Sequence, residues 1–129
     1  MDEARLQQIR PFAGLSTAER KMLARVVDEL SVSPGTTLVR QGDYGYEFMV
    51  IEEGDVDVFR DGERIDTMGP GDFFGELAVL ADGGLRNATI VTTSPARVLT
   101  LTAHYLRLMR EQMPQLAEQI EQVISARTH

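Results

Sequence analysis

The chain has 129 residues and a formal net charge of −7, with 43% hydrophobic and 26% charged residues. These values are typical of one soluble globular domain, and the acidic balance disfavours direct binding to nucleic acid, which needs a basic face. The sequence contains no cysteine, which excludes disulfides and cysteine–zinc sites. No apolar run approaches the roughly 20 residues of a membrane span, and the N-terminus lacks a signal-peptide pattern. We therefore expect a cytoplasmic protein that makes no membrane contact.

Two helices are predicted in an N-terminal helical part that covers residues 1–30. The first spans residues 3–10, and its apolar anchors are Ala4, Leu6 and Ile9. The second begins at a capping box in which Ser16 is the N-cap and Glu19 reaches back from the third helical position. Its spacing predicts one buried stripe that consists of Met22, Leu23, Val26, Val27 and Leu30.

Between about residues 31 and 102 the apolar period changes to the alternation of β-strands. Turn signals recur at Pro34-Gly35, Gly42-Asp43, Asp61-Gly62, Gly69-Pro70-Gly71 and Ser94-Pro95. The clearest hairpin joins residues 56–59 to residues 65–68 through Asp61-Gly62, with Val56 and Val58 facing inward. Residues 89–93 and 96–101 are expected to complete the strands. The pattern predicts an antiparallel β-roll or barrel.

After Thr102 the helical period returns. Residues 103–111 are predicted to form one helix, and Pro114 opens another that runs to about Arg127. This last helix carries an apolar stripe of Leu116, Ile120, Val123 and Ile124. The stripe is expected to cover a ligand, to meet a second copy as a dimer seam, or to pack back on the β-roll, and the sequence leaves the three open.

Residues 71–91 combine a glycine turn, one acid, a short apolar helical turn and one arginine. Gly75 lets the backbone approach a ligand without a Cβ, and the N–H groups of a helix starting near Glu76 favour negative charge. Arg86 supplies donors that match phosphate oxygens. Glu76 would repel a phosphate, so we expect it to accept a hydrogen bond from a neighbouring hydroxyl. A nucleotide with a free ribose hydroxyl meets both demands.

The run Phe74-Gly75-Glu76-Leu77-Ala78, with Arg86 ten positions after the acid and Ala88-Thr89 beyond it, resembles the phosphate-binding cassette of the cyclic nucleotide-binding domain family. That family includes catabolite activator-type regulators, regulatory subunits of cyclic-nucleotide-dependent kinases and nucleotide-gated channels. The resemblance extends over nearly the whole chain and includes turn positions at Gly42-Asp43 and Gly54. It implies an α+β, mainly β fold: a jelly-roll-like antiparallel β-roll of eight strands with N-terminal helices and two C-terminal helices. Residues 1–129 would then form a single domain, with the cassette inserted in the roll.

The function implied by the resemblance is non-catalytic binding of a 3′,5′-cyclic nucleotide, with cAMP favoured over cGMP. The implied ligand-binding residues are Phe74, Gly75, Glu76, Leu77, Ala78, Arg86, Asn87 and Ala88. Arg86 would take the exocyclic oxygens of the phosphate, helped by backbone N–H groups near Ala78 and just after the arginine. Glu76 and the backbone of Gly75 would hold the 2′-hydroxyl. The signal would come from movement of the C-terminal helices.

The chain departs from the family pattern at two positions beside the arginine. Leu85 stands where many members have proline, and Asn87 stands where Ala, Ser or Thr is usual. Asn87 either bonds neighbouring backbone or contacts the phosphate or the purine edge, and both readings stay open because an amide donates and accepts. Among nearby aromatic residues, Phe73 and Phe74 are expected in the core. Tyr44 and Tyr46 are expected at the surface or in a strand rather than in contact with a ligand.

Other classes of function are weighed against this one. The chain could be an interaction or dimerisation module whose site is rarely occupied, or the sensor part of a larger transcription regulator. A metal-dependent barrel enzyme is disfavoured, because the only histidines, His104 and His129, lie outside the β-region. We expect no catalytic residue, cofactor or metal ligand. The expected partners are a cyclic nucleotide and either a second copy of the chain or a separate effector.

Overall fold

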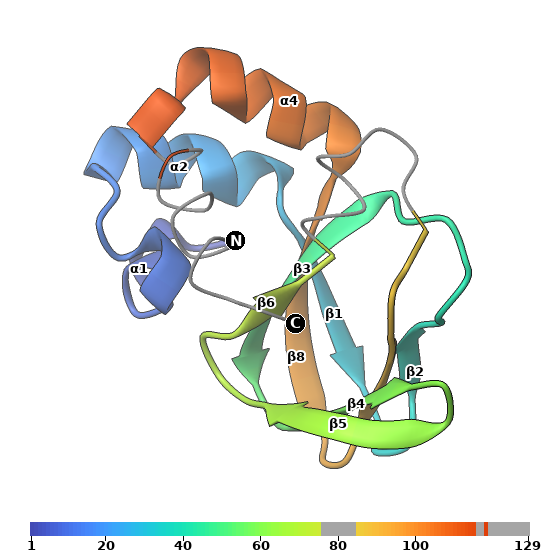
Figure 1. Cartoon of the computed structure of the whole chain (residues 1–129). Helices are drawn as coiled ribbons and strands as arrows, with labels where there is room; N and C mark the ends of the chain where they lie inside the picture. Colours follow the sequence, from blue (N-terminus) through green and yellow to red (C-terminus); the bar gives the residue numbers. More distant parts are fainter. Residues whose placement is uncertain (76–84, 116–117, 119–129) are drawn as a thin grey trace.

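The computed structural model of the chain describes residues 1–75, 85–115 and 118. It is mainly antiparallel β-structure, with the helices gathered at one end of the strands (Figure 1). The helical segments are α1 (Glu3–Gln7), the 3-10 turn η1 (Arg10–Phe12), α2 (Thr17–Val26) and α4 (Ala103–Gln112). The strands are β1 (Asp28–Val32), β2 (Thr37–Val39), β3 (Glu47–Glu53), β4 (Val56–Arg60), β5 (Glu63–Met68), β6 (Phe73–Phe74), β7 (Thr89–Thr92) and β8 (Ala96–Thr102). The predicted mainly β fold is confirmed.

The strands form two four-stranded sheets, one in the order β1-β8-β3-β6 and the other in the order β2-β7-β4-β5. Neighbouring strands are antiparallel throughout both sheets. The two-residue strand β6 lies at one edge of the first sheet, where Phe74 pairs with Met49 and Phe73 with Val50. The first strand of the segment that resembles a phosphate-binding cassette is therefore paired with β3.

The β4–β5 hairpin forms as the sequence predicts. Its two-residue turn, Asp61-Gly62, has φ angles of +53° and +82°, and the flanking residues Arg60 and Glu63 are paired. Positive φ at both turn residues matches the right-handed twist of the strands and explains the preference for Asp-Gly. Val56 and Val58 both face the core, as expected.

The N-terminal helical part is shorter than the predicted span of residues 1–30. The capping box is present, because Ser16 accepts from the Glu19 N–H at 3.1 Å and Glu19 accepts from the Ser16 N–H at 2.9 Å. However, α2 ends at Val26, and Leu30 lies in β1, where it pairs with Val98 and is 41% exposed. The predicted buried stripe is wrong at Leu30 and also at Met22, which is exposed. Residues 28–32 instead form backbone pairs with β8, which the helical spacing of their apolar residues does not reveal.

The first helix is also shorter than the predicted residues 3–10. It ends at Gln7, and Ile9 adopts an extended conformation before η1. A continuous helix is disfavoured because Pro11 has no N–H to donate and its ring would clash with the carbonyl of residue 7. Leaving the helix turns Ile9 into the core, and Leu6 is also buried, whereas the predicted anchor Ala4 is exposed.

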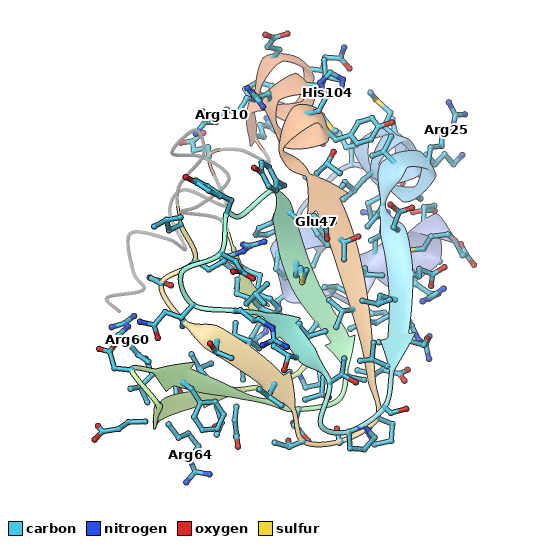
Figure 2. All side chains as sticks on the ribbon, turned by 90° about the vertical axis from the view of Figure 1, so that its right-hand side faces the viewer. Arg25, Glu47, Arg60, Arg64, His104 and Arg110 are labelled. Atoms are coloured by element: carbon cyan, nitrogen blue, oxygen red, sulfur yellow. The ribbon has the colours of Figure 1, made fainter. Side chains whose placement is uncertain are left out.

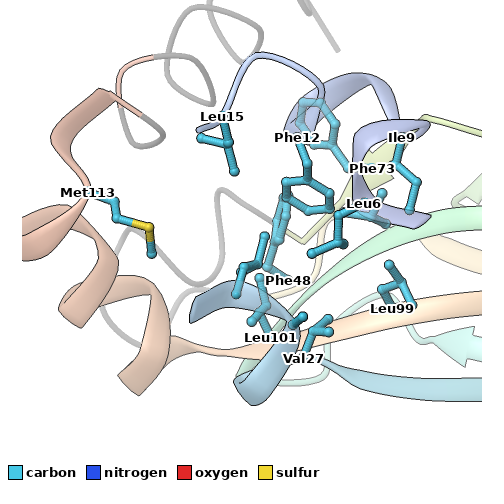
Figure 3. Packing of buried hydrophobic residues seen from close by; sticks show 13 residues of the cluster. Leu6, Ile9, Phe12, Leu15, Val27, Phe48, Phe73, Leu99, Leu101 and Met113 are labelled. Atoms are coloured by element: carbon cyan, nitrogen blue, oxygen red, sulfur yellow. The ribbon is translucent and has the colours of Figure 1, made fainter. Parts of the chain in front are cut away.

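Two hydrophobic clusters stabilise the fold. One packs the N-terminal helices, η1 and Met113, the residue directly after α4, against the first sheet (Figure 3). The other lies between the two sheets and includes Ile51, Val56 and Val98. Phe73 belongs to the first cluster and its neighbour Phe74 to the second, because successive strand residues face opposite sides. The prediction that both are core residues is confirmed, and β6 is anchored on both faces.

The helix predicted at residues 103–111 is confirmed as α4, and Met113 just beyond it is buried in the first cluster. The second C-terminal helix, predicted from Pro114 to about Arg127, lies almost entirely outside the described residues. Among the helices that the structure describes, none is both long and apolar enough to cross a membrane.

Candidate functional site

Arg86 lies just before β7 and is buried, with 8% of its surface exposed. Its backbone is held by the glycine turn that precedes β3. The Arg86 N–H donates to the Asp43 carbonyl at 2.7 Å, and the Arg86 carbonyl accepts from the Gly42 N–H at 2.9 Å. Leu85 forms a β-bridge with Tyr44 beside this pair of bonds. The turn at Gly42-Asp43, expected from the sequence, therefore fixes where the arginine enters the site.

The guanidinium of Arg86 is oriented by a backbone carbonyl. Its Nη2 donates to the Glu47 carbonyl oxygen at 2.8 Å. Glu47 is the first residue of β3, at the helical end of the sheet, and Figure 2 shows its position on that strand. Because β3 is paired with β8 and β6, the carbonyl is a fixed acceptor rather than a mobile side chain. No sequence pattern points to it, because every residue carries a carbonyl.

Gly75 is the position that allows this arrangement. Its φ is +86°, a conformation that side-chain-bearing residues rarely adopt. A Cβ at Gly75 would lie against Nη1 of Arg86 and 2.6 Å from the carbonyl oxygen of Glu47. The sequence predicts a close backbone approach at this glycine, and the described neighbours that come close are the arginine and the carbonyl that orients it.

Two predicted site residues beside this centre have buried side chains, and one is exposed. The side chains of Phe74 and Ala88 both pack in the core between the sheets. Asn87 is exposed, and its carbonyl accepts from Nε of Arg60 at 3.2 Å. Three predicted site residues lie outside the described residues: Glu76, Leu77 and Ala78. Their roles remain predictions.

A pocket of about 210 Å³ opens beside Arg86. Its apolar lining comes from Leu38, Val39 and Met49, and two tyrosines, Tyr44 and Tyr46, also line it. The tyrosines are 63% and 64% exposed, which agrees with the prediction that they lie at the surface. Their place on the pocket was not predicted, although their position next to the Gly42-Asp43 turn was the available signal.

The charges around the pocket are nearly balanced. Among the described residues that line it, Arg40 and Arg86 are positively charged, and Asp43 and Glu47 are negatively charged. An anion would therefore be attracted by the buried guanidinium of Arg86 rather than by the field of the whole chain, whose net charge is −7. Within the described part of the chain, no cluster of three or more His, Cys, Asp or Glu residues could hold a metal ion.

Comparisons with known proteins agree with this geometry. The sequence matches the family model of the cyclic nucleotide-binding domain over residues 29–113. It is 33% identical over 101 residues to a cAMP-dependent protein kinase regulatory subunit of Hypocrea atroviridis, covering 78% of this chain and 22% of that protein. It is 36% identical over 103 residues to the regulatory subunit of the same name from Colletotrichum orbiculare, covering 78% of this chain and 26% of that protein.

Among solved structures, the Thermus thermophilus catabolite activator protein superposes with a TM-score of 0.80 at 27% identity, covering 90% of this chain and 56% of that one. The chain spans only about a quarter of the length of the two fungal regulatory subunits. The match covers most of this chain and includes both Arg86 and the Gly42-Asp43 turn that holds it. The chain belongs to the cyclic nucleotide-binding domain family.

Proposed function

We propose that this chain is a non-catalytic sensor module that binds a 3′,5′-cyclic nucleotide, with cAMP favoured over cGMP. The observation that carries the proposal is Arg86, a buried arginine that borders a pocket and is oriented by a backbone carbonyl. A cyclic phosphodiester bears a single negative charge, which one guanidinium can match with paired hydrogen bonds. The name of the two fungal relatives, cAMP-dependent protein kinase regulatory subunit, favours cAMP.

The ribose would be recognised by the acid of the cassette. Glu76 would accept a hydrogen bond from the 2′-hydroxyl, the one hydroxyl that the cyclic phosphate leaves free, together with the backbone of Gly75. Arg86 would bind the exocyclic phosphate oxygens. This division of roles follows from charge, because a carboxylate repels the phosphate but is a strong acceptor for a hydroxyl.

Thermal unfolding with added nucleotides tests the proposal. A ligand that binds the folded state adds about 2.7 kcal/mol of stability at 100 times its Kd. We expect cAMP to raise the melting temperature, and 2′-deoxy-cAMP and 5′-AMP to raise it much less at equal concentration. If neither cAMP nor cGMP protects the chain at millimolar concentration, the reading as an interaction module with a rarely occupied site takes precedence.

The choice of base depends on contacts around Asn87, whose side chain is exposed. Its amide can donate to one purine edge and accept from another, so both adenine and guanine have a partner there. We expect a modest preference for cAMP. A competition titration in which cGMP displaces cAMP at lower concentration would reverse that preference and leave the cyclic phosphate site in place.

The signal would be a population shift of the C-terminal helices. One described link supports this route: Met113, the residue directly after α4, is buried in the same cluster as Phe73 of β6, the strand that leads into the cassette (Figure 3). Removing residues 114–129 separates the roles proposed for the last helix. Faster nucleotide release in stopped flow indicates a lid, and a halved mass in light scattering indicates a dimer seam. No change in either leaves packing alone and contradicts the proposed route.

A second candidate is that the chain is the sensor part of a larger regulator. The observation in its favour is length, because the chain covers 22% of the Hypocrea relative and 56% of the Thermus catabolite activator protein. The nucleotide site would be the same in both cases. Sequencing the complete gene distinguishes the two, since an adjoining DNA-binding or kinase-inhibiting segment would identify the output.

A further inference from the structure

Tyr44 and Tyr46 line the same pocket as Arg86. Tyr44 is bridged to Leu85, the residue directly before the arginine, and Tyr46 directly precedes Glu47, whose carbonyl holds the guanidinium. Both tyrosines line the pocket that Arg86 borders, yet they are 63% and 64% exposed. They are the two most exposed of the large hydrophobic side chains in the described part of the chain. Two exposed aromatic rings that line this pocket are available to contact a molecule bound beside Arg86.

The pocket also has an aliphatic lining. Leu38 and Val39 of β2 are half-buried against the core between the sheets, and Met49 of β3 is buried in it. The pocket thus combines one buried cation, an aliphatic floor and an aromatic rim. This set of groups fits a ligand that carries both an anion and a flat ring.

We infer that Tyr44 and Tyr46 form an aromatic rim that contacts the base of the bound nucleotide, an inference that rests on the proposed function. Aromatic side chains stack on any base, because every base has a π-face. The rim therefore raises the affinity for both cAMP and cGMP and does not choose between them. Selectivity between the two bases arises from groups that read the purine edge.

Calorimetry on paired variants tests the rim. We expect the double variant Tyr44→Ala/Tyr46→Ala to bind cAMP and cGMP about tenfold more weakly, by the usual strength of one base–aromatic contact. The double variant Tyr44→Phe/Tyr46→Phe keeps the rings and should bind both within about threefold of the parent. Tyr105→Ala is the matched control, because Tyr105 is an exposed tyrosine on α4 that does not line this pocket.

Ribose 3′,5′-cyclic phosphate, which lacks the base, separates the rings from the phosphate site. The double alanine variant should bind this compound as tightly as the parent does. An equal loss for the base-free compound would overturn the rim, because the tyrosines would then act on the phosphate or on the turn. The same conclusion follows if the double phenylalanine variant is as weak as the double alanine variant, since the hydroxyls would be responsible.

Intrinsic fluorescence gives a second readout, because the chain has three tyrosines and no tryptophan. In a Tyr105→Phe background all emission comes from the proposed rim. We expect saturating cAMP to quench it and the base-free cyclic phosphate to leave it unchanged. Unaltered affinity and unaltered fluorescence in the presence of bound cAMP would overturn the rim and leave the Arg86 site standing. A parent chain that binds neither compound overturns the proposed function as well.

Discussion

Two arginines of this chain are buried to nearly the same degree, Arg20 at 7% and Arg86 at 8% exposure, yet their surroundings differ. Arg20 of α2 is enclosed by acceptors from the helical end of the chain: Glu3 Oε2 at 2.9 Å, the Leu15 carbonyl and Thr17 Oγ1 at 3.2 Å. Arg86 donates to the carbonyl of Glu47 and also borders a pocket. Burial alone therefore does not separate a structural arginine from one that is proposed to bind a ligand.

The two arginines differ in the groups that surround their guanidinium groups. Around Arg20 a carboxylate of the same chain supplies the opposite charge, so the pair links α1 to α2. Arg86 donates to the carbonyl of Glu47 and, unlike Arg20, is among the residues that line the pocket. We expect replacement of Arg20 to lower mainly the free energy of unfolding, and replacement of Arg86 to weaken mainly the binding of the nucleotide.

The largest expected effect is on binding in Arg86→Leu. A desolvated phosphate that loses its opposite charge costs about 2–5 kcal/mol, which is roughly a 30-fold to several-thousand-fold rise in Kd. Calorimetry with cAMP measures this loss, and thermal unfolding without ligand should show that the variant still folds. Arg64→Leu is the matched control, because the Arg64 side chain is 63% exposed on β5. Binding by the Arg86 variant within a few-fold of the parent would contradict the assignment of the site.

Gly75→Ala should lower both binding and stability. The positive φ costs about 1 kcal/mol for a residue with a Cβ, and the approach of that Cβ to the Glu47 carbonyl and to Arg86 forces a shift. We expect a loss of about 2–3 kcal/mol in the free energy of unfolding, measured by denaturant titration, and at least tenfold weaker cAMP binding.

Gly35→Ala provides the control for Gly75→Ala. Gly35 has a similar φ of +82°, but a Cβ there meets nothing within 4 Å. The control should therefore lose only the backbone contribution of about 1 kcal/mol and keep its affinity for cAMP. Equal stability losses in the two variants would mean that the close approach at Gly75 carries no energy.

Arg20→Met should show the opposite profile to Arg86→Leu. Removing one member of a buried ion pair leaves an uncompensated charge, which costs about 3–5 kcal/mol when the partner is fully enclosed. Because the Glu3 side chain is 26% exposed and can regain water, we expect a loss of about 2 kcal/mol. Denaturant titration measures it. The Kd for cAMP should stay within about twofold, and a larger loss of affinity would contradict the division between the two arginines.

Features specified by neighbouring residues were predicted correctly. The Ser16/Glu19 capping box and the Asp61-Gly62 hairpin each depend on a few adjacent side chains and on local backbone conformation. Leu30 was placed on the wrong element, because its partner Val98 is distant in sequence and helical spacing carries no trace of that pairing. Local chemistry thus predicted the elements, and long-range pairing decided one of their boundaries.

The same distinction applies to the candidate site. Arg86 and Gly75 could be predicted as site residues because a guanidinium and a missing side chain are visible as residue types. The carbonyl of Glu47 was missed, because a backbone acceptor has no residue signature. The place of Tyr44 and Tyr46 on the pocket depends on how the turn before β3 folds against Leu85, which only the structure reveals.

The smallest expected effect is at Arg5, which bridges Glu52 of β3, with Nε at 3.1 Å from Oε2, and Glu29 of β1. Hydrogen bonds to Glu52 and then to Glu29 raise the pKa of the Arg5 guanidinium above its ordinary value. Because the pKa is raised in the folded chain, the contribution of Arg5 to stability is fully present at every pH at which this arginine is charged in the unfolded chain. It is lost only in strong alkali, so the effect of Arg5 should not change between pH 5 and 9.

Arg5→Met should lower the free energy of unfolding by only about 0.5–1 kcal/mol, because its side chain is 33% exposed and Glu52 keeps Arg97 at 3.3 Å. The loss should shrink further in about 1 M salt, where exposed pairs are screened. Arg10→Met, at a side chain that is 73% exposed and paired with Asp72, is the control and should lose less still. If Arg5→Met proved as costly as Arg20→Met, burial would not be what gives the Arg20 pair its strength. The contrast between Arg20 and Arg86 would then have to rest on the pocket alone.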